Sequence, residues 1–491
     1  MKPVIMKLQL SRLYCSPFIF LFILFSTTLF AQQQNSVGKG IYTILDKNAD
    51  NLLRKSRAYS VSIGLVKDGK VYTKHYGELD KGKGNKADNN TSFDVASVTK
   101  VMTGYLMAKA VLEKKVNLDD DIRKYLDGSY PNLAFQGIPV RITDLVSFKT
   151  AFDREIPDNS QIRKINDDST CFRIKKMDES YSKRQFLEDL KRIQLDTIPG
   201  KKHKYSNTSL ELSALILEKV YNKNFETLLN EYFFSATKMN ASKRNLKVDR
   251  NIANGYSSNH LLMPNSYTNL WAAGGYRNST MNDLIKFLSF ELDTKNKIVQ
   301  ESQRNLSGSD QSWNGYFWDE IGVSENGKYC YKHGGAFGTN TLFMVYPELN
   351  MGICIIVNIT GENTFGNLYE TVVEIAEDLE TKSTEKIDYG YKLTDDKVVF
   401  RYQHSKKLDP KLVKSISVAG SFNDWNPNNK AYQMHSKGKN VYELELPKSQ
   451  FERGKTFAFK FVINQNSWLL TPTNALNTDK TADNNLTFKI D

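Results

Sequence analysis

The 491-residue sequence contains only four cysteines, and their placement excludes two kinds of cross-linked protein. Cys15 lies in the N-terminal segment, which leaves Cys171, Cys330 and Cys354 in the rest of the chain. An odd number of widely spaced thiols is neither a disulfide framework nor a zinc site. Because Cys330 and Cys354 fall in two strand-like runs, whether they form a disulfide stays open at this stage.

The sequence also lacks long apolar runs beyond its N-terminus and lacks dense basic blocks. Apart from residues 17–30, no stretch approaches the ~20 apolar residues that cross a bilayer. The 67 basic residues outnumber the 55 acidic ones, but they are scattered and not interleaved with aromatics in the way that follows a nucleic-acid backbone. We therefore expect no nucleic-acid partner and no stable membrane span in the mature chain.

Two catalytic signatures are absent as well. No Gly-x-Ser-x-Gly elbow occurs, which argues against an α/β-hydrolase. No His-Glu-x-x-His segment and no His/Cys cluster with zinc spacing occurs either. The sequence therefore predicts no metal and no cofactor.

The N-terminus has the order of a secretory signal peptide. Basic residues precede the mostly apolar stretch 17–30, and small Ala31 then meets three glutamines. We expect a signal peptide over residues 1–31, with an uncleaved anchor as the alternative. The mature protein is accordingly expected in the periplasm or secreted.

Residues 32–382 are expected to form one α+β domain. Two β-prone runs, 59–66 and 71–76, flank an Asp-Gly turn, which is a strong hairpin signal. Apolar helical patterns cover 98–115 and 209–220. Further strand-like runs, at 341–345 and 351–359, indicate a sheet that gathers sequence-distant segments. Between the helices, residues 151–198 are polar and irregular and are expected to form a long excursion with some helix.

The C-terminal region has a different texture. Residues 383–397 are polar and charged and read as a linker, and residues 398–491 alternate short β-prone runs with turn residues. This pattern predicts a small all-β sandwich of the immunoglobulin-like kind.

A Ser-x-x-Lys motif at residues 97–100 is the first candidate for catalysis. At the start of a helix, side chains three residues apart lie on one face, and the helix N-terminus favours a developing oxyanion. Lys100 in an apolar helix should have a lowered pKa, which makes it a base for the Ser97 hydroxyl. Five other Ser-x-x-Lys matches, at 36, 180, 235, 383 and 436, lack the rigid apolar helix that follows Ser97. A capping serine beside a snorkelling lysine is the alternative interpretation.

A Tyr-x-Asn motif opens the second apolar helix. Tyr205 has a phenol that can exchange a proton near a lysine, and the Asn207 amide can orient a substrate carbonyl. The same spacing at Tyr130 and Tyr267 has no amphipathic helix behind it.

A third motif, His-Gly-Gly-Ala at residues 333–336, follows a strand-like run. Its glycines would let a substrate backbone approach a strand edge, and an N–H beyond them could complete an oxyanion hole. A simple turn is the alternative.

In this order, the three motifs resemble the serine β-lactamase and penicillin-binding-protein superfamily, nearest to its class C-like esterases, D-aminopeptidases and DD-peptidases. The resemblance covers roughly residues 40–378. It implies a β-lactamase/transpeptidase-like fold, in which an antiparallel sheet carries helices on both faces beside a helical region.

The resemblance also implies a role for each motif residue. Ser97 is the nucleophile and Lys100 its proton acceptor. Tyr205 passes a proton to the leaving group, and Asn207 holds the substrate. For the third motif, His333 takes the place of the family's strand lysine, and the N–H groups of Ser97 and Ala336 form the oxyanion hole.

Two departures from the family pattern affect these expectations. The segment 145–151 has Phe148 and Ala151 where relatives carry histidine and glycine, so its local fold is open. Replacing the strand lysine by His333 removes a permanent cation. That favours an ester or amide substrate without the carboxylate that a β-lactam bears.

The C-terminal region resembles the glycogen-binding module of AMP-activated kinase β subunits. The resemblance rests on Gly-Ser-Phe-Asn-Asp-Trp-Asn at 420–426 and on later aromatic and Asn positions. It implies that Trp425 and Trp468 stack on sugar rings while Lys460 and Asn484 bond hydroxyls. A core role for the tryptophans, or a packing module without sugar, is the alternative.

The sequence thus predicts an exported serine hydrolase that forms an acyl-enzyme with an ester, a small amide or a D-amino-acid peptide. Its partners would be that small-molecule or peptide substrate and, through the sandwich, an α-glucan. Two alternatives stay open: a cell-wall DD-peptidase or β-lactamase, and a non-catalytic carbohydrate-binding protein on a hydrolase scaffold.

Overall fold

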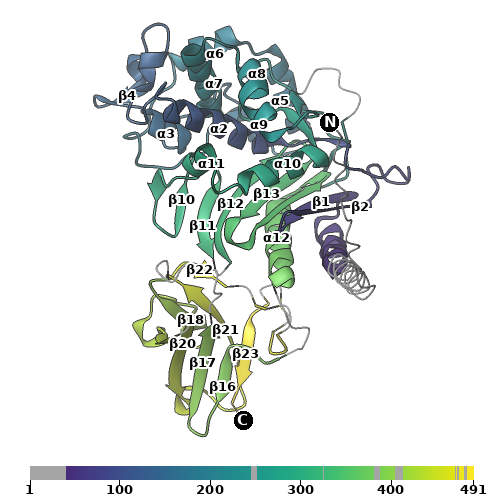
Figure 1. Cartoon of the computed structure of the whole chain (residues 1–491), viewed down its shortest axis with the longest axis vertical. Helices are drawn as coiled ribbons and strands as arrows, with labels where there is room; N and C mark the ends of the chain where they lie inside the picture. Colours follow the sequence, from purple (N-terminus) through teal and green to yellow (C-terminus); the bar gives the residue numbers. More distant parts are fainter. Residues whose placement is uncertain are drawn as a thin grey trace, which may run out of the picture.

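The computed structural model describes residues 40–490 except 245–251, 325, 381–386, 404–412, 439, 470, 473–474, 480 and 482–483. The expected signal peptide, residues 1–31, lies outside the described residues. An α+β part is followed by a smaller all-β part at the C-terminal end (Figure 1).

An eight-stranded antiparallel sheet forms the centre of the α+β part, in the order β2-β1-β14-β13-β12-β11-β10-β9. Its first and last long strands are neighbours, because β1 pairs with β14 over the register from Val61↔Val357 to Lys67↔Met351. The sheet therefore does gather sequence-distant segments. Its strands are β1 (Ser60–Lys67), β2 (Lys70–Gly77), β9 (Ser307–Gly308), β10 (Ser312–Asn314), β11 (Glu320–Ser324), β12 (Gly327–Gly335), β13 (Asn340–Tyr346) and β14 (Met351–Val357).

The first hairpin forms for the reason that the sequence indicated. Asp68 and Gly69, the two loop residues between β1 and β2, have φ values of 51° and 74°. Two consecutive left-handed residues make the turn whose twist matches an antiparallel pair, and Asp-Gly adopts it readily.

Helices cover both faces of the sheet, each over its own apolar core. The helix over residues 40–56 and α12 (Thr364–Glu380) pack against one face. On the other face lie α10 (Met281–Glu291) and α2 (Thr99–Leu112), followed by the helical region at the top of Figure 1. The remaining helices are α3 (Ile142–Val146), α4 (Ser160–Arg163), α5 (Ser169–Ser180), α6 (Lys183–Leu190), α7 (Asn207–Tyr221), α8 (Phe225–Leu228), α9 (Ser235–Thr237) and α11 (Lys297–Ser302).

Short strands tie the helical region to the sheet. Of these, β3 lies directly before Ser97 and pairs with β8, which follows the 272–275 segment. The short strands are β3 (Ser92–Asp94), β4 (Ala134–Phe135), β5 (Ile138–Pro139), β6 (Lys243–Arg244), β7 (Tyr256–Ser257), β8 (Arg277–Thr280) and β15 (Ile359–Thr360).

The polar excursion 151–198 contains some helix, as expected, in α4, α5 and α6. It is also fixed to the segment before β8. Asn269 Nδ2 donates to the Glu179 carbonyl at 2.7 Å, and the Tyr276 hydroxyl donates to Asp178 at 3.0 Å.

The C-terminal part consists of two four-stranded sheets that share one aromatic core, in which Phe400 and Phe459 lie 5.1 Å apart. Strand β16 falls within 383–397, the segment expected to be a linker, so the all-β part begins earlier than residue 398. One sheet contains β16 (Tyr391–Leu393), β17 (Lys397–Gln403), β19 (His435–Gly438) and β20 (Val441–Pro447); the other contains β18 (Ile416–Gly420), β21 (Thr456–Ile463), β22 (Ser467–Trp468) and β23 (Leu486–Lys489).

The two parts touch where β11 meets β22. The Ser467 hydroxyl donates to the Val323 carbonyl at 3.4 Å, and Val323 packs into the aromatic core of the C-terminal part. Lys414 and Asp310 form an ion pair of 3.0 Å beside this contact.

The three cysteines among the described residues form no disulfide. Cys330 on β12 and Cys354 on β14 are buried free thiols, and β13 separates their strands. Cys171 is also free and is partly exposed.

Candidate active site

Ser97 is presented by a sharp turn between β3 and α2. It lies in the short 3₁₀ helix η1 (Ala96–Val98), which leads directly into α2. Ala96 has φ of 43°, a left-handed conformation that non-glycine residues seldom adopt outside functional sites. Asp94 holds this turn, because its Oδ1 accepts the Ala96 N–H at 3.0 Å.

Lys100 is fully buried one helical turn beyond Ser97. Its Nζ lies 3.0 Å from Ser97 Oγ and 2.6 Å from Asn207 Oδ1, and it also donates to the Gly274 carbonyl. Burial holds the pKa of Lys100 well below its ordinary value, and the charge of Lys332 lowers it further. The amine is thereby suited to accept a proton.

Tyr205 and Asn207 join this cluster from the start of α7. The Tyr205 hydroxyl donates to Ser97 Oγ at 2.7 Å, while 42% of the residue is exposed. Loss of solvent around the hydroxyl raises the pKa of Tyr205, and the nearby Asp319 carboxylate raises it further. The structure therefore brings four of the expected site residues together: Lys100 and Tyr205 contact Ser97 Oγ, and Asn207 contacts Lys100.

His333 lies elsewhere than expected. Successive residues of a strand point to opposite faces, and His333 belongs to the face of β12 that α12 covers. Its Nε2 is 2.8 Å from Asn340 Oδ1, and its ring lies 4.9 Å from that of Phe365 on α12. The imidazole is therefore not the counterpart of the strand lysine.

Lys332, one residue earlier, occupies that position. Its fully buried Nζ lies 4.8 Å from the centre of the Tyr205 ring and 5.4 Å from that of Phe148. A buried cation on β12 therefore lies beside Tyr205, although it is not at position 333. Burial lowers the pKa of Lys332, and Asp319 acts in the opposite direction.

Beyond Lys332, the backbone N–H that faces the open edge of β12 belongs to the residue before the expected one. The Ala336 N–H donates to the Thr339 carbonyl at 2.9 Å and thus faces inward to β13. The His333 N–H points away from β13, because it donates to Asp319. Since N–H groups two residues apart on a strand point the same way, the Gly335 N–H faces the open edge near Ser97 and Ala336 does not.

Asp319 binds β12 at two points. Its Oδ1 forms an ion pair of 2.5 Å with Lys332 Nζ, and its Oδ2 accepts the His333 N–H at 2.7 Å. The residue lies directly before β11, where that strand stops pairing with β12. No sequence motif marked it.

Comparison with known proteins identifies the α+β part, since residues 45–377 match the Beta-lactamase family. The chain belongs to the beta-lactamase family. Protein flp of Staphylococcus aureus (strain MRSA252) is 25% identical over 332 residues, which cover 65% of this chain and 63% of that protein. Protein flp of strain MW2 is 24% identical over the same length. The chain thus spans less than two thirds of the length of these relatives.

A shorter match within the beta-lactamase family joins the chain to a protein of Escherichia coli (strain K12). That protein is named "Putative D-alanyl-D-alanine carboxypeptidase". It is 30% identical over 189 residues, which cover 36% of this chain and 41% of the relative.

Two further residues support the site of this beta-lactamase-family chain, and the sequence did not predict a role in the site for either of them. Phe148, which departs from the family motif, stacks on Tyr205 with ring centres 4.9 Å apart. Buried Glu211 accepts the N–H groups of Trp271 at 2.8 Å and Ala273 at 3.2 Å, and so fixes the segment that presents the Gly274 carbonyl to Lys100. An apolar helix interrupted by Glu was the only sequence signal for the latter.

The expected sugar-binding residues lie in the C-terminal part, beyond the family match. The rings of Trp425 and Trp468 have centres 6.2 Å apart, and Trp468 is 43% exposed. Lys460 lies on the same face of β21 as Val462, the partner of Trp468 across the sheet. Asn484 is exposed in the turn before β23.

Within the described residues, no helix combines the length and apolar character that a membrane span requires. Over the same ranges, no group of three or more His, Cys, Asp or Glu side chains is arranged to hold a metal ion.

Proposed function

We propose that this chain is an exported serine hydrolase that forms an acyl-enzyme on Ser97. Its substrate class is an ester, a small amide or a D-amino-acid peptide. The observation that carries the proposal is the surroundings of Lys100 Nζ, which has Ser97 Oγ, Asn207 Oδ1 and the Gly274 carbonyl as neighbours.

These three neighbours suit both protonation states of the amine. Asn207 Oδ1 and the Gly274 carbonyl only accept hydrogen bonds, so they take both N–H groups of a neutral amine. The lone pair is then left for the hydroxyl proton of Ser97. Once that proton has moved, the ammonium still has three acceptors, so little rearrangement accompanies the transfer.

Acylation follows from this geometry. Ser97 Oγ attacks the substrate carbonyl carbon while its proton passes to Lys100. The charge that develops on the carbonyl oxygen faces the N–H groups of Ser97 and Gly335. Tyr205, kept neutral by its raised pKa, gives its proton to the leaving group as the bond to that group breaks.

Deacylation reverses these roles. The proton held on Lys100 returns to Tyr205, because both groups lie within hydrogen-bonding distance of the same Ser97 Oγ. A water molecule then attacks the acyl carbon, gives one proton to this pair, and frees the acid with Ser97 restored.

A fluorophosphonate probe with intact-mass analysis tests the proposal. The wild type should gain one label, and Ser97→Ala should gain none. Ser235→Ala is the matched control, since Ser235 begins another Ser-x-x-Lys segment and should label fully. Equal labelling of wild type and Ser97→Ala would remove the central claim.

The second candidate function is cell-wall DD-peptidase or β-lactamase activity, and the name of the Escherichia coli relative favours it. A hydrolysis screen with p-nitrophenyl esters, nitrocefin and D-alanyl peptides separates the two candidates.

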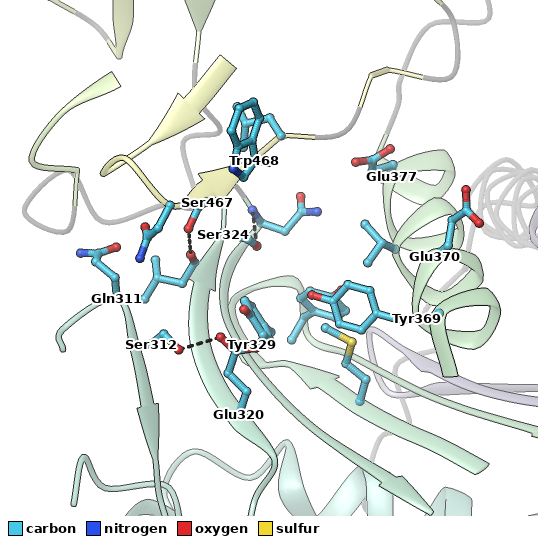
Figure 2. Close-up of a pocket in the computed structure, with 18 residues that line it drawn as sticks. Gln311, Ser312, Glu320, Ser324, Tyr329, Tyr369, Glu370, Glu377, Ser467 and Trp468 are labelled. Atoms are coloured by element: carbon cyan, nitrogen blue, oxygen red, sulfur yellow. Dashed lines mark hydrogen bonds between the residues drawn. The ribbon is translucent and has the colours of Figure 1, made fainter. Parts of the chain in front are cut away.

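We further propose that the C-terminal part binds an α-glucan. Trp425 and Trp468 offer two neighbouring ring faces, and flat rings stack on the apolar faces of sugars. Trp468 also borders a pocket of about 460 Å³ between β22 and α12, shown in Figure 2. Tyr329 and Tyr369 line the opposite wall.

The residues that line this pocket disfavour an anionic ligand. Among these described residues are tyrosines, serines, asparagines and three glutamates (Glu320, Glu370 and Glu377), but no lysine, arginine or histidine. A phosphate or carboxylate ligand would meet no cation there. A sugar chain that leaves Trp468 toward α12 would find hydroxyl and amide partners instead.

A further inference from the structure

Asp319 lies where the leaving group of a substrate would pass. In the mechanism, Tyr205 protonates the leaving group, so that group departs toward the Tyr205 hydroxyl. Lys332 Nζ lies 4.8 Å from the centre of the Tyr205 ring, and Asp319 Oδ1 binds that Nζ at 2.5 Å. The Asp319–Lys332 pair thus borders the leaving-group side of the site.

The same carboxylate also ends the open edge of β12. A substrate that extends along this edge from Gly335 meets His333 next, and the N–H of His333 is already taken by Asp319 Oδ2. Lys332 and the His333 N–H together are the donors that a substrate carboxylate would seek there. Asp319 satisfies both of them with one side chain.

We propose that Asp319 is an internal counter-ion that occupies the carboxylate position of the site, and that the enzyme therefore selects esters or amides with an uncharged leaving group. This inference rests on the proposed acyl-enzyme function and names its substrate class. From the sequence, a carboxylate-free substrate was expected because position 333 carries no permanent cation. In the structure a cation is present on β12, but Asp319 neutralises it.

The charges of Lys332 and Asp319 already compensate each other without a substrate carboxylate. Lys332 is fully buried, and a buried lone ammonium is costly unless a carboxylate compensates it. A second carboxylate brought by the substrate would leave an excess negative charge beside Asp319, and like charges in contact are costly. The other titratable groups near Lys332 and Lys100 include His203, His333, Tyr205, Glu155 and Glu211.

Two aryl esters with the same acyl group test the inference, one with a plain phenol leaving group and one with a meta-carboxylate on that phenol. The wild type should prefer the plain ester in kcat/KM. Asp319→Asn keeps an oxygen for the His333 N–H but removes the charge. It should shift the ratio toward the carboxylate ester by on the order of tenfold or more.

The pH dependence adds a readout that a purely structural role would not produce. In Asp319→Asn the unpaired Lys332 must be protonated to attract the carboxylate, so the shift should grow as the pH falls. In the wild type the ratio should stay nearly flat. The double variant Asp319→Asn/Lys332→Gln should lose the gain, because no cation remains.

Each outcome separates this inference from the function on which it rests. If Ser97→Ala hydrolyses both esters as well as wild type, the acyl-enzyme proposal itself fails. If hydrolysis needs Ser97 and the wild type favours the carboxylate ester tenfold, only the role of Asp319 is overturned, even should Asp319→Asn not fold. An unchanged ratio in a folded Asp319→Asn variant overturns it as well.

Discussion

At the scale of single residues, the site depends on the pKa of the buried Lys100 amine, which its surroundings shift in opposite directions. Burial and the charge of Lys332 both lower the pKa of Lys100, whereas Asp319 raises it. A base must be neutral to accept the Ser97 proton, so acylation should rise with pH up to the pKa of Lys100 and then level off.

Replacing Lys332 should move that rise to higher pH. In Lys332→Met the like charge is gone while Asp319 remains, so the pKa of Lys100 should increase and labelling at neutral pH should fall. The measurement is the rate of fluorophosphonate labelling from pH 5 to pH 10. Lys328→Met, on the same strand but bonded to Gln303, is the control. Superimposable profiles for wild type and Lys332→Met would exclude this coupling.

Lys100→Ala should lower the labelling rate on the order of 10²-fold or more at every pH, because the proton acceptor is absent. The same labelling assay measures it, with a thermal melt to verify folding. Near-normal labelling of a folded variant would rule out Lys100 as the base.

The motif residues could be predicted where the chemistry is local, and failed where it depends on strand register. Ser97, Lys100, Tyr205 and Asn207 lie at helix starts, whose spacing fixes side-chain direction. On β12 the structure turns the Lys332 side chain toward Tyr205 and the His333 side chain toward α12, because neighbouring residues on a strand face opposite sides. Only the pairing of β12 with β13 settles that register.

At the scale of elements, the site exists because β12 approaches η1 closely. A Cβ on Gly334 would lie 2.2 Å from the Val95 carbonyl oxygen, which is closer than atoms can pack. Glycine at position 334 therefore lets β12 lie close enough to η1 for the Gly335 N–H to face the site of Ser97. The sequence predicted the hairpin and the long helices well, but not the strand order, because nonlocal pairing leaves no local pattern.

Gly334→Ala should push β12 and η1 apart. We expect a loss of about 1–3 kcal/mol in the free energy of unfolding and a strong loss of labelling at Ser97. Gly335→Ala is the matched control, since its Cβ would meet Asn340 Oδ1 at 3.4 Å and its N–H is kept. Urea unfolding and probe labelling report the two effects. Full labelling of Gly334→Ala would show that the approach is not required.

At the scale of the whole molecule, a hydrolase domain carries an all-β part whose tryptophans face the junction. Retention of the full chain on insoluble starch should fall with Trp425→Ala, because one of two stacking faces is lost, by about 1–3 kcal/mol of binding free energy. Tyr432→Ala is the control, since Tyr432 lies in the same part but packs on Phe422. Retention unaffected by Trp425→Ala would sink the stacking proposal.

The union of β1 with β14 has a consequence for how the protein is made. Val61 on β1 pairs with Val357 on β14. The central sheet therefore cannot be completed until nearly the whole α+β part has left the ribosome. A nascent chain that stays open for this long is available to an export machinery that moves unfolded polypeptide. Under the export proposed above, Ser97 would join the rest of its site only after that passage.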